Sequence, residues 1–424
     1  MPHPFETLGV KIPRILLPKN TRALDTWCVV ACDQYTSDPA YWAAVERTVG
    51  DAPSTLKMVL PEVYLGTGEQ QARVARTYRT MQRYLDQGVL YELPCGCILT
   101  QRRLPDGNRV RTGLVVSLDL ERYSHESDAK TLIRVTEGTI PARIPPRLAI
   151  REKASLELPH IMVLFDDPGR TVLEPLAARA DKFETVYDAD LGFNMGHITG
   201  RFIPADQLVG VQQALSSLYD ALGAGDGDPM LFAMGDGNHS FATAKAHWEN
   251  VKKDLSPAEQ QTHPARYALC ELVNIHDESL LFEPIHRALF HVPDGAVATL
   301  AEAMQADLAP APVAGRRCMP YVCGAEQGVF VFRHETDQLD AALADRAIAT
   351  LMAEHPEVEV DYIHGEKETR ALGQKPGQLG LLLRVVQKDE LFPLVSRYGA
   401  LPRKSFSMGE ADEKRCYLEA KRIL

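Results

Sequence analysis

The sequence predicts a mixed α/β protein (α+β in its details) with one large, irregular mixed-sheet core. Short apolar runs alternate with stretches of helical periodicity along the 424 residues. The strand-like runs are unevenly spaced, which argues against a regular barrel or a doubly wound sheet. Apolar residues make up 45% of the chain and charged residues 24%, which is ordinary for a globular protein and excludes collagen-like and disordered classes.

The elements of the first half follow from periodicity and capping signals. The apolar run 27–32 predicts a buried strand that ends in a polar turn. Asp38 followed by Pro39 then has the pattern of a helix start. Further periodic segments predict a helix over 68–87 and strands over 114–118 and 160–165.

The second half contains the clearest helix, over 206–222, whose apolar residues form one stripe. A short buried strand over 229–234 then leads through a tight turn into another helix, from Ser240 onwards. Next come a helix over 297–308, a stiff Ala-Pro linker and a strand pair at 318–323 and 328–333.

A change of composition near 290–315 suggests an insertion in the chain. We therefore expect a main domain over 1–294 and 341–424, and an inserted α/β subdomain over 295–340. The candidate site segments described below are spread from residue 33 to residue 410, which favours one large catalytic unit over three independent domains.

The charge and the cysteines limit the classes of partner. The net charge of −11 is opposite in sign to that of a general phosphate-backbone binder, so we expect no nucleic-acid partner. The apolar runs are five or six residues long, too short to span a membrane.

The eight cysteines are expected to be free thiols in a cytoplasmic protein, since no secretory signal pattern precedes them. The sequence leaves the oligomeric state open, with a homodimer as one option.

The sharpest candidate site lies at the turn between the predicted strand 229–234 and the helix behind it. Two glycines permit positive φ and close backbone approach, and a helix N-terminus offers unpaired N–H groups to an anion such as phosphate. His239 and Ser240 would bond phosphate oxygens, and Asp236 would bind a metal ion or act as an acid or base. The candidate phosphate- or nucleotide-binding residues are Gly235, Gly237, Asn238, His239 and Ser240. A helix cap with Asn238 as the N-cap is the structural alternative.

A second candidate follows the predicted strand 27–32. A carboxylate and hydroxyls on a loop at a strand end are typical of substrate binding in α/β enzymes. The residues are Asp33, Gln34, Tyr35, Thr36 and Ser37. The alternative is a turn that only caps the next helix.

A third candidate is the arginine-bearing segment 134–151. Its prolines break a helix, so we expect an extended segment that recognises phosphate or carboxylate, with a solvated loop as the alternative. The candidate substrate-binding residues are Thr136, Glu137, Arg143 and Arg147. Lys404, in the basic segment 402–410, would close over a phosphate or lie on a surface turn.

These motifs together resemble those of a bacterial and archaeal family, DUF1015. Six segments carry the resemblance, in order along nearly the whole chain: CDQYTS at 32–37, TEGT at 136–139, NMGH at 194–197, GDGNHS at 235–240, DYIHGE at 361–366 and PRKSFSMGE at 402–410. The fourth segment is also similar to the D-G-H-x-R box of ParB/sulfiredoxin-like free-serine kinases, which cradles nucleotide phosphates. Here Asn238 replaces the first His and Ser240 the Arg, which removes one fixed cation.

The resemblance implies a phosphotransferase that moves phosphate from ATP or ADP, with Mg²⁺, to a small hydroxyl substrate, in the first place free L-serine. Asp33 or Asp236 would activate the hydroxyl or bind Mg²⁺, and His239 would hold phosphate. Arg143 and Arg147 would hold phosphate or the substrate carboxylate. Two other functions fit the same anion site: a phosphomonoester hydrolase of the phosphoserine type, and a non-catalytic regulator that binds a nucleotide or phosphometabolite.

Overall fold

The computed structural model describes residues 2–223 and 228–424, which form two compact units. The first unit comprises the chain up to Leu280 together with Gly409–Leu424, and the second is Leu281–Met408. The second unit contains the expected insertion 295–340 but is larger than it. The additional residues, 281–294 and 341–408, belong to it because they supply further strands to the same sheet.

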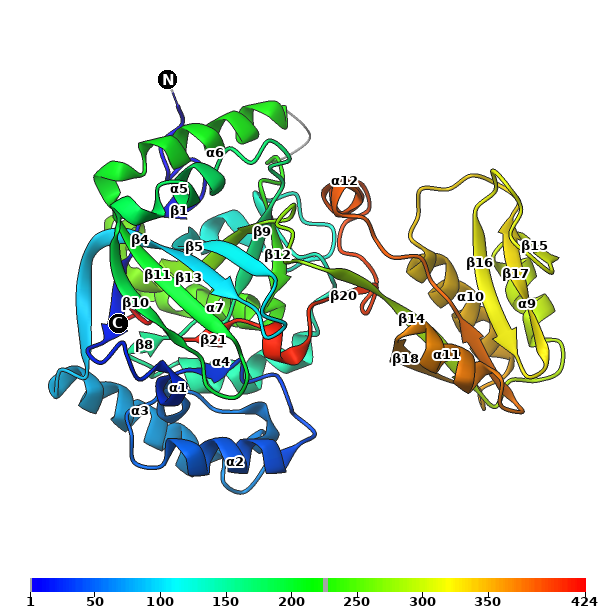
Figure 1. Cartoon of the computed structure of the whole chain (residues 1–424), viewed down its shortest axis with the longest axis horizontal. Coiled ribbons are helices and arrows are strands. Elements are labelled where there is room, and N and C mark those ends of the chain that lie inside the picture. The colour runs from blue at the N-terminus through cyan, green and yellow to red at the C-terminus, as the bar shows by residue number, and fades with distance from the viewer. Residues whose placement is uncertain (1, 224–227) are drawn as a thin grey trace. The chain divides into compact units, whose positions relative to one another are not determined.

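The first unit is built on a mixed sheet of 11 strands among the described residues (Figure 1). This confirms the mixed fold with one large irregular sheet. Nine strands follow one another in the order β10 (Glu184–Asp190), β11 (His197–Pro204), β4 (Leu90–Arg103), β5 (Val110–Asp119), β13 (Tyr267–Asn274), β9 (Met162–Phe165), β12 (Phe232–Asp236), β7 (Ile133–Arg134) and β6 (Tyr123–Ser124). Two further strands, β1 (Val10–Lys11) and β2 (Arg14–Pro18), pair with β5 and β4.

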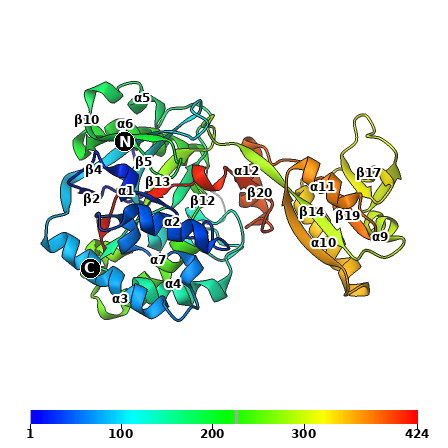
Figure 2. The ribbon, with the colours of Figure 1, turned by 60° about the horizontal axis from the view of Figure 1, so that its bottom comes forward.

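Helices cover this sheet on two sides. Figures 1 and 2 show α5 (Glu174–Ala177) and α6 (Val209–Ala221) on one side, and α2 (Pro39–Val49) and α3 (Gln70–Asp86) on the other. The expected helices 68–87 and 206–222 are therefore confirmed as α3 and α6. The start of α2 is confirmed too, because the Asp38 side chain accepts a hydrogen bond from the Tyr41 N–H and Pro39 begins the helix.

Two expectations for the first unit are wrong in detail. The expected strand 27–32 is buried, but only β3 (Val29–Val30) is extended, since residues before it form the short helix α1 (Leu24–Trp27). The segment 134–151 is not extended throughout, because Ile144–Arg151 forms the helix α4. Its two prolines occupy the first turn, where their missing N–H groups would have had no helical partner.

The chain returns to the first unit at its end. The strand β21 (Cys416–Tyr417) pairs with β3, and β22 (Lys421–Arg422) pairs with β8 (Leu156–Glu157). Next to β21, the buried Arg415 donates to Glu271 Oε2 at 2.8 Å, to Glu419 Oε2 at 2.7 Å and to the Pro159 carbonyl at 2.8 Å. These charge-assisted bonds fix the final segment against the start of β9 and the middle of the sheet.

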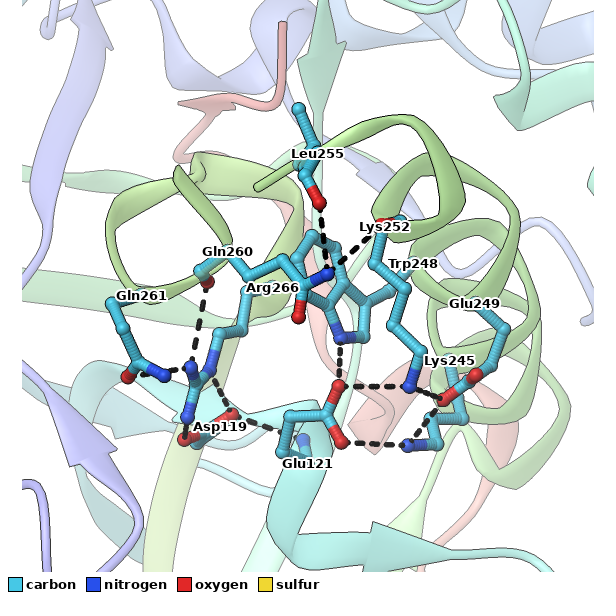
Figure 3. Close-up of polar contacts among 10 residues, drawn as sticks. All are labelled: Asp119, Glu121, Lys245, Trp248, Glu249, Lys252, Leu255, Gln260, Gln261 and Arg266. Carbon is cyan, nitrogen blue, oxygen red and sulfur yellow. Dashed lines mark hydrogen bonds and ion pairs between the residues drawn. The ribbon is translucent and has the colours of Figure 1, made fainter. Parts of the chain in front are cut away.

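The long helix α7 (Asn238–Val251) follows β12 and packs against α4 (Figure 2). Polar contacts fix its far end (Figure 3). Glu121, just after β5, accepts from the Trp248 indole N–H at 2.6 Å and from Lys252 Nζ at 3.0 Å. Lys245 and Glu249 extend this network along the helix. These contacts fix the C-terminal half of α7 to the segment that follows β5.

The second unit is a smaller α/β body with its own sheet. Its strands run in the order β15 (Ala306–Ala309), β17 (Glu326–Phe332), β16 (Cys318–Cys323), β19 (Gln378–Leu381), β14 (Phe282–Phe290) and β18 (Glu359–His364), and β20 (Phe406–Met408) also pairs with β14. Its helices are α9 (Ala296–Ala303), α10 (Asp340–Glu354), α11 (Glu366–Gly373) and α12 (Lys388–Tyr398). The strand pair expected at 318–323 and 328–333 is confirmed. The helix expected over 297–308 ends at Ala303, because β15 follows almost at once.

None of the described helices is both long and apolar enough to cross a membrane.

Candidate active site

Several strand ends meet at one edge of the large sheet. Strands β7 and β12 are parallel neighbours, so the segments that follow them, 135–140 and 237–240, leave the sheet at the same edge. Strand β9 is antiparallel to β12, with Met162 opposite Asp236, so the residues just before β9 lie there as well. Two of the three sequence-predicted segments are thus brought together by strand direction alone.

The turn into α7 depends on Gly237. Its φ is +84°, and a Cβ atom there would lie 3.0 Å from Ile161 Cγ1, so both conformation and space favour glycine. Gly237 donates its N–H to Asp236 Oδ1 at 2.9 Å and serves as the N-cap. The alternative in which Asn238 caps the helix is therefore wrong, because Asn238 is the first residue of α7.

The N-terminus of α7 has the features of an anion site. The first N–H groups of a helix have no carbonyl partner within the helix and carry a partial positive charge. Around them, three buried side-chain atoms make no hydrogen bond with any described residue: Asp236 Oδ2, Asn238 Oδ1 and Thr139 Oγ1. Buried polar atoms are rarely left in this state, so the site has unused hydrogen-bonding capacity for a ligand.

The segment after β7 contacts this turn directly. The Thr136 hydroxyl donates to the Met234 carbonyl at 2.7 Å, and His239 Nε2 accepts from the Ile140 N–H at 3.2 Å. An accepting Nε2 is unprotonated, so the Nδ1 atom of the neutral ring holds the proton. His239 thus ties the start of α7 to the neighbouring strand end.

His160, which sequence reasoning missed, joins Asp33 to the start of α7. Its side chain is almost fully buried, and its Nε2 lies 3.3 Å from Ser240 Oγ and 3.9 Å from Asp33 Oδ2. Both contacts are made by the same ring nitrogen, so this is not a serine-hydrolase triad, in which the carboxylate holds the other nitrogen. The signal that could have found it was its place as the first residue of the predicted buried strand 160–165.

Lys414 is the second residue that sequence reasoning missed. It precedes β21, and because β21 runs antiparallel to β3, Lys414 lies across from the residues that follow β3. Its Nζ is 3.7 Å from Asp236 Oδ2. It also acts on Asp33: burial alone would raise the pKa of that carboxyl, but His160, the Gln34 amide and Lys414 together hold the pKa of Asp33 below its usual value. Asp33 is therefore a carboxylate at neutral pH.

A cavity of about 150 Å³ opens beside this polar cluster. His160, Ser240 and Tyr417 form one wall. The other walls are mostly apolar and come from 58–65, from α4 and from the start of β8. The Tyr417 hydroxyl donates to Cys32 Sγ at 2.9 Å, which fixes the loop that bears Asp33.

The remaining predicted residues lie as follows. Gln34 donates to Asp33 and Tyr35 stacks on Tyr41, while Thr36 and Ser37 are exposed.

Arg147 donates to Glu62 at 2.7 Å, and Arg143 is exposed beside the start of α4. Gly235 and Glu137 are half-buried near the strand ends. Lys404 belongs to the second unit, where its carbonyl accepts from Arg287 at 3.0 Å. The roles assigned to these residues stay predictions.

The described residues include no group of three or more His, Cys, Asp and Glu side chains that could hold a metal ion. Mg²⁺ in phosphotransferases usually binds one or two carboxylates and completes its shell with phosphate oxygens and water. Asp236 Oδ2, which makes no hydrogen bond with any part of the chain that the structure describes, fits such a partial site.

The family model for DUF1015, described as "Protein of unknown function", matches residues 15–376. No curated protein sequence matches the chain. Among solved structures, the chain is similar to C-terminally truncated SbnI from Staphylococcus aureus (9% identity, TM-score 0.39, covering 72% of this chain and 85% of that one). It is also similar to a free serine kinase mutant in complex with ADP (9%, 0.39, 73% and 92%) and to a conserved hypothetical protein from Pyrococcus furiosus (10%, 0.36, 71% and 93%).

Proposed function

The chain belongs to the DUF1015 family, and from its site we propose that it transfers phosphate from ATP or ADP to a small hydroxyl substrate. One observation carries the proposal. A glycine-capped helix N-terminus with unused polar atoms lies beside two carboxylates, Asp33 and Asp236, that share one lysine. Phosphoryl transfer needs this combination, because it depends on positioning and on electrostatic stabilisation of phosphate oxygens.

In the proposed reaction the acceptor oxygen forms a bond to the terminal phosphorus, and the bond from that phosphorus to its bridging oxygen breaks. ATP leaves as ADP, or ADP leaves as AMP. The acceptor proton passes to Asp33, whose lowered pKa keeps it ionised and ready to accept. His160 orients this carboxylate and Ser240.

The other groups hold the phosphates. The N–H groups at the start of α7 would bind the oxygens of the transferred phosphate, and Lys414 would neutralise charge as it develops. Mg²⁺, when bound, would neutralise part of the negative charge of the phosphate oxygens, and Asp236 would be its protein ligand. Three contacts support these roles: His160 Nε2 lies 3.3 Å from Ser240 Oγ and 3.9 Å from Asp33 Oδ2, and Lys414 Nζ lies 3.7 Å from Asp236 Oδ2.

Incubation of the purified protein with ATP or ADP, Mg²⁺ and L-serine tests the proposal. L-serine is the first acceptor to try, because the sequence resemblance implies it, and a small panel of other alcohols belongs in the same experiment. The expected result is a phosphorylated acceptor together with an equal amount of ADP or AMP, measured by mass spectrometry.

Calorimetry in which phosphoserine binds but neither nucleotide binds would favour the hydrolase instead. Nucleotide binding without turnover of any alcohol would favour the regulator.

A further inference from the structure

We infer that the hydroxyl acceptor carries an apolar group about the size of a benzene ring, and that the cavity beside Ser240 receives it. The inference rests on the proposed function, because it concerns the acceptor of that reaction. It differs from the sequence-based expectation of free L-serine, whose side chain is a single hydroxymethyl group.

The size and the walls of the cavity carry the inference. Its volume is about 150 Å³. An apolar cavity of this size in another protein holds a benzene ring. Most of its walls are hydrocarbon, from residues such as Met58, Leu60, Ile150, Leu156 and Leu269. Burial of an apolar group stabilises the complex in proportion to the apolar surface area that is removed from water.

The charged residues of the cavity are already paired with one another. Arg147 contacts Glu62, and Arg151 contacts Glu157. The pKa of Glu157 is lowered because Lys421 and Arg151 outweigh the effect of its burial, so this pair is ionised. An amino-acid zwitterion in the cavity would have to bury an ammonium and a carboxylate without free partners, which is costly. A neutral apolar group avoids this cost.

The position of the cavity supplies the link to the reaction. His160 and Ser240 line the cavity, and the Nε2 atom of His160 lies 3.3 Å from Ser240 Oγ and 3.9 Å from Asp33 Oδ2. An alcohol whose apolar body fills the cavity therefore presents its hydroxyl to this polar wall. The phosphate site at the start of α7 adjoins the same wall, because Ser240 belongs to both.

Benzyl alcohol and L-serine are the probes for the test, used on the full-length protein with ATP and with ADP in the presence of Mg²⁺. We expect kcat/KM for benzyl alcohol to exceed that for L-serine by at least about tenfold. Ala154→Phe, which fills the cavity, should lower kcat/KM for benzyl alcohol at least about tenfold and change the Kd of ADP less than about twofold. Ile150→Ala enlarges the cavity from a half-buried position and should shift the preference toward 2-naphthylmethanol, so the test does not depend on one variant folding.

Each contrary result has a separate meaning. Faster phosphorylation of L-serine than of benzyl alcohol would overturn this inference and support the proposed function. If Ala154→Phe weakened ADP binding as much as it lowered kcat/KM for benzyl alcohol, the inference would also be overturned, because the cavity would then hold the nucleotide base. Benzyl alcohol binding that both variants alter, with no nucleotide bound by the wild type, would instead overturn the proposed phosphotransfer.

Discussion

Asp33 and Asp236 are the two residues to which the proposed function assigns the chemistry, and their surroundings differ. Asp33 interacts with His160 and with the Gln34 amide, whereas Asp236 uses one oxygen for the Gly237 N–H and keeps the other without a hydrogen bond from any described residue. The first arrangement suits a proton acceptor and the second a cation ligand. The sequence alone left both roles open to both residues, because it did not reveal His160 as a neighbour of Asp33.

Asp33→Asn removes the proposed proton acceptor with little change in shape. We expect kcat to fall at least about 100-fold while the Kd of ADP changes less than about threefold. Asp38→Asn, in the same loop, is the matched control: asparagine caps helices as well as aspartate does, so its kcat should match the wild type. Steady-state kinetics and calorimetry measure both quantities, and a kcat in Asp33→Asn close to the wild type would contradict the assignment.

Gly237→Ala tests the phosphate turn. Its positive φ and the 3.0 Å approach to Ile161 Cγ1 should together cost about 2 kcal/mol of the free energy of unfolding, and ADP affinity should fall about tenfold. Gly107→Ala has a similar φ of +74° with open space around it, so about 1 kcal/mol and unchanged ADP affinity are expected there. Urea unfolding and calorimetry compare the two variants. Equal losses of ADP affinity would show that the turn has no special role.

At the scale of elements, α7 connects the site to the rest of the first unit. Its helix was predictable because a buried strand, a glycine turn and alanine-rich periodicity follow one another in the sequence. The helical conformation of α4 was not predicted, because Pro145 and Pro146 argue against a helix everywhere except in its first turn. The partner of α7 at its far end, Glu121, also escaped prediction, since a lone glutamate after a strand has no sequence signature.

Glu121→Ala tests how α7 is held (Figure 3). The variant leaves the N–H of Trp248, whose side chain is fully buried, without its acceptor and should lower the free energy of unfolding by about 1–3 kcal/mol. Glu249→Ala is the control, because that glutamate binds the same two lysines, Lys245 and Lys252, at a more exposed position, and should cost less than about 1 kcal/mol. Urea unfolding measures both variants, and an equal loss of the free energy of unfolding in the two would contradict the role of Glu121.

His247, in the middle of α7, should make stability depend on pH. Burial, with a smaller effect of Arg151, lowers its pKa to about 4, so the folded protein binds a proton less readily than the unfolded chain. Stability from this residue is therefore complete above pH 6.5 and declines as pH falls toward 4. Urea unfolding at pH 7 and pH 5 should show a larger loss for the wild type than for His247→Gln. Equal losses would contradict the assigned shift.

Over the whole molecule, the sequence predicted one large unit with an insertion over 295–340, whereas the structure divides into two compact units, the second of which is Leu281–Met408. The insertion is longer because the strands β18 and β19 lie far along the chain from the expected segment 295–340 yet complete its sheet. Such long-range pairing leaves no local signal. The return of Gly409–Leu424 to the first unit could not be predicted from the sequence for the same reason. It depends on hydrogen bonds from Arg415 to Glu271 and to the Pro159 carbonyl, which lie far away along the chain.

The boundaries themselves can be tested. Phe282 pairs with Met408, so the second unit begins and ends on neighbouring strands whose Cα atoms are about 5 Å apart. Replacing Leu281–Met408 with a short Gly-Ser linker should leave the first unit folded, with one cooperative thermal transition. An unfolded product would contradict this division.

We propose that the segments after β3, β7 and β12, with His160 and Lys414, form one phosphotransfer site. A crystal structure of the protein with ADP and Mg²⁺ would show where the nucleotide binds. We expect the terminal phosphate within hydrogen-bond distance of the N–H groups of 238–240, with Mg²⁺ on Asp236 and Asp33 facing the acceptor side. ADP bound elsewhere in the chain, with the N-terminus of α7 in contact with solvent, would contradict it.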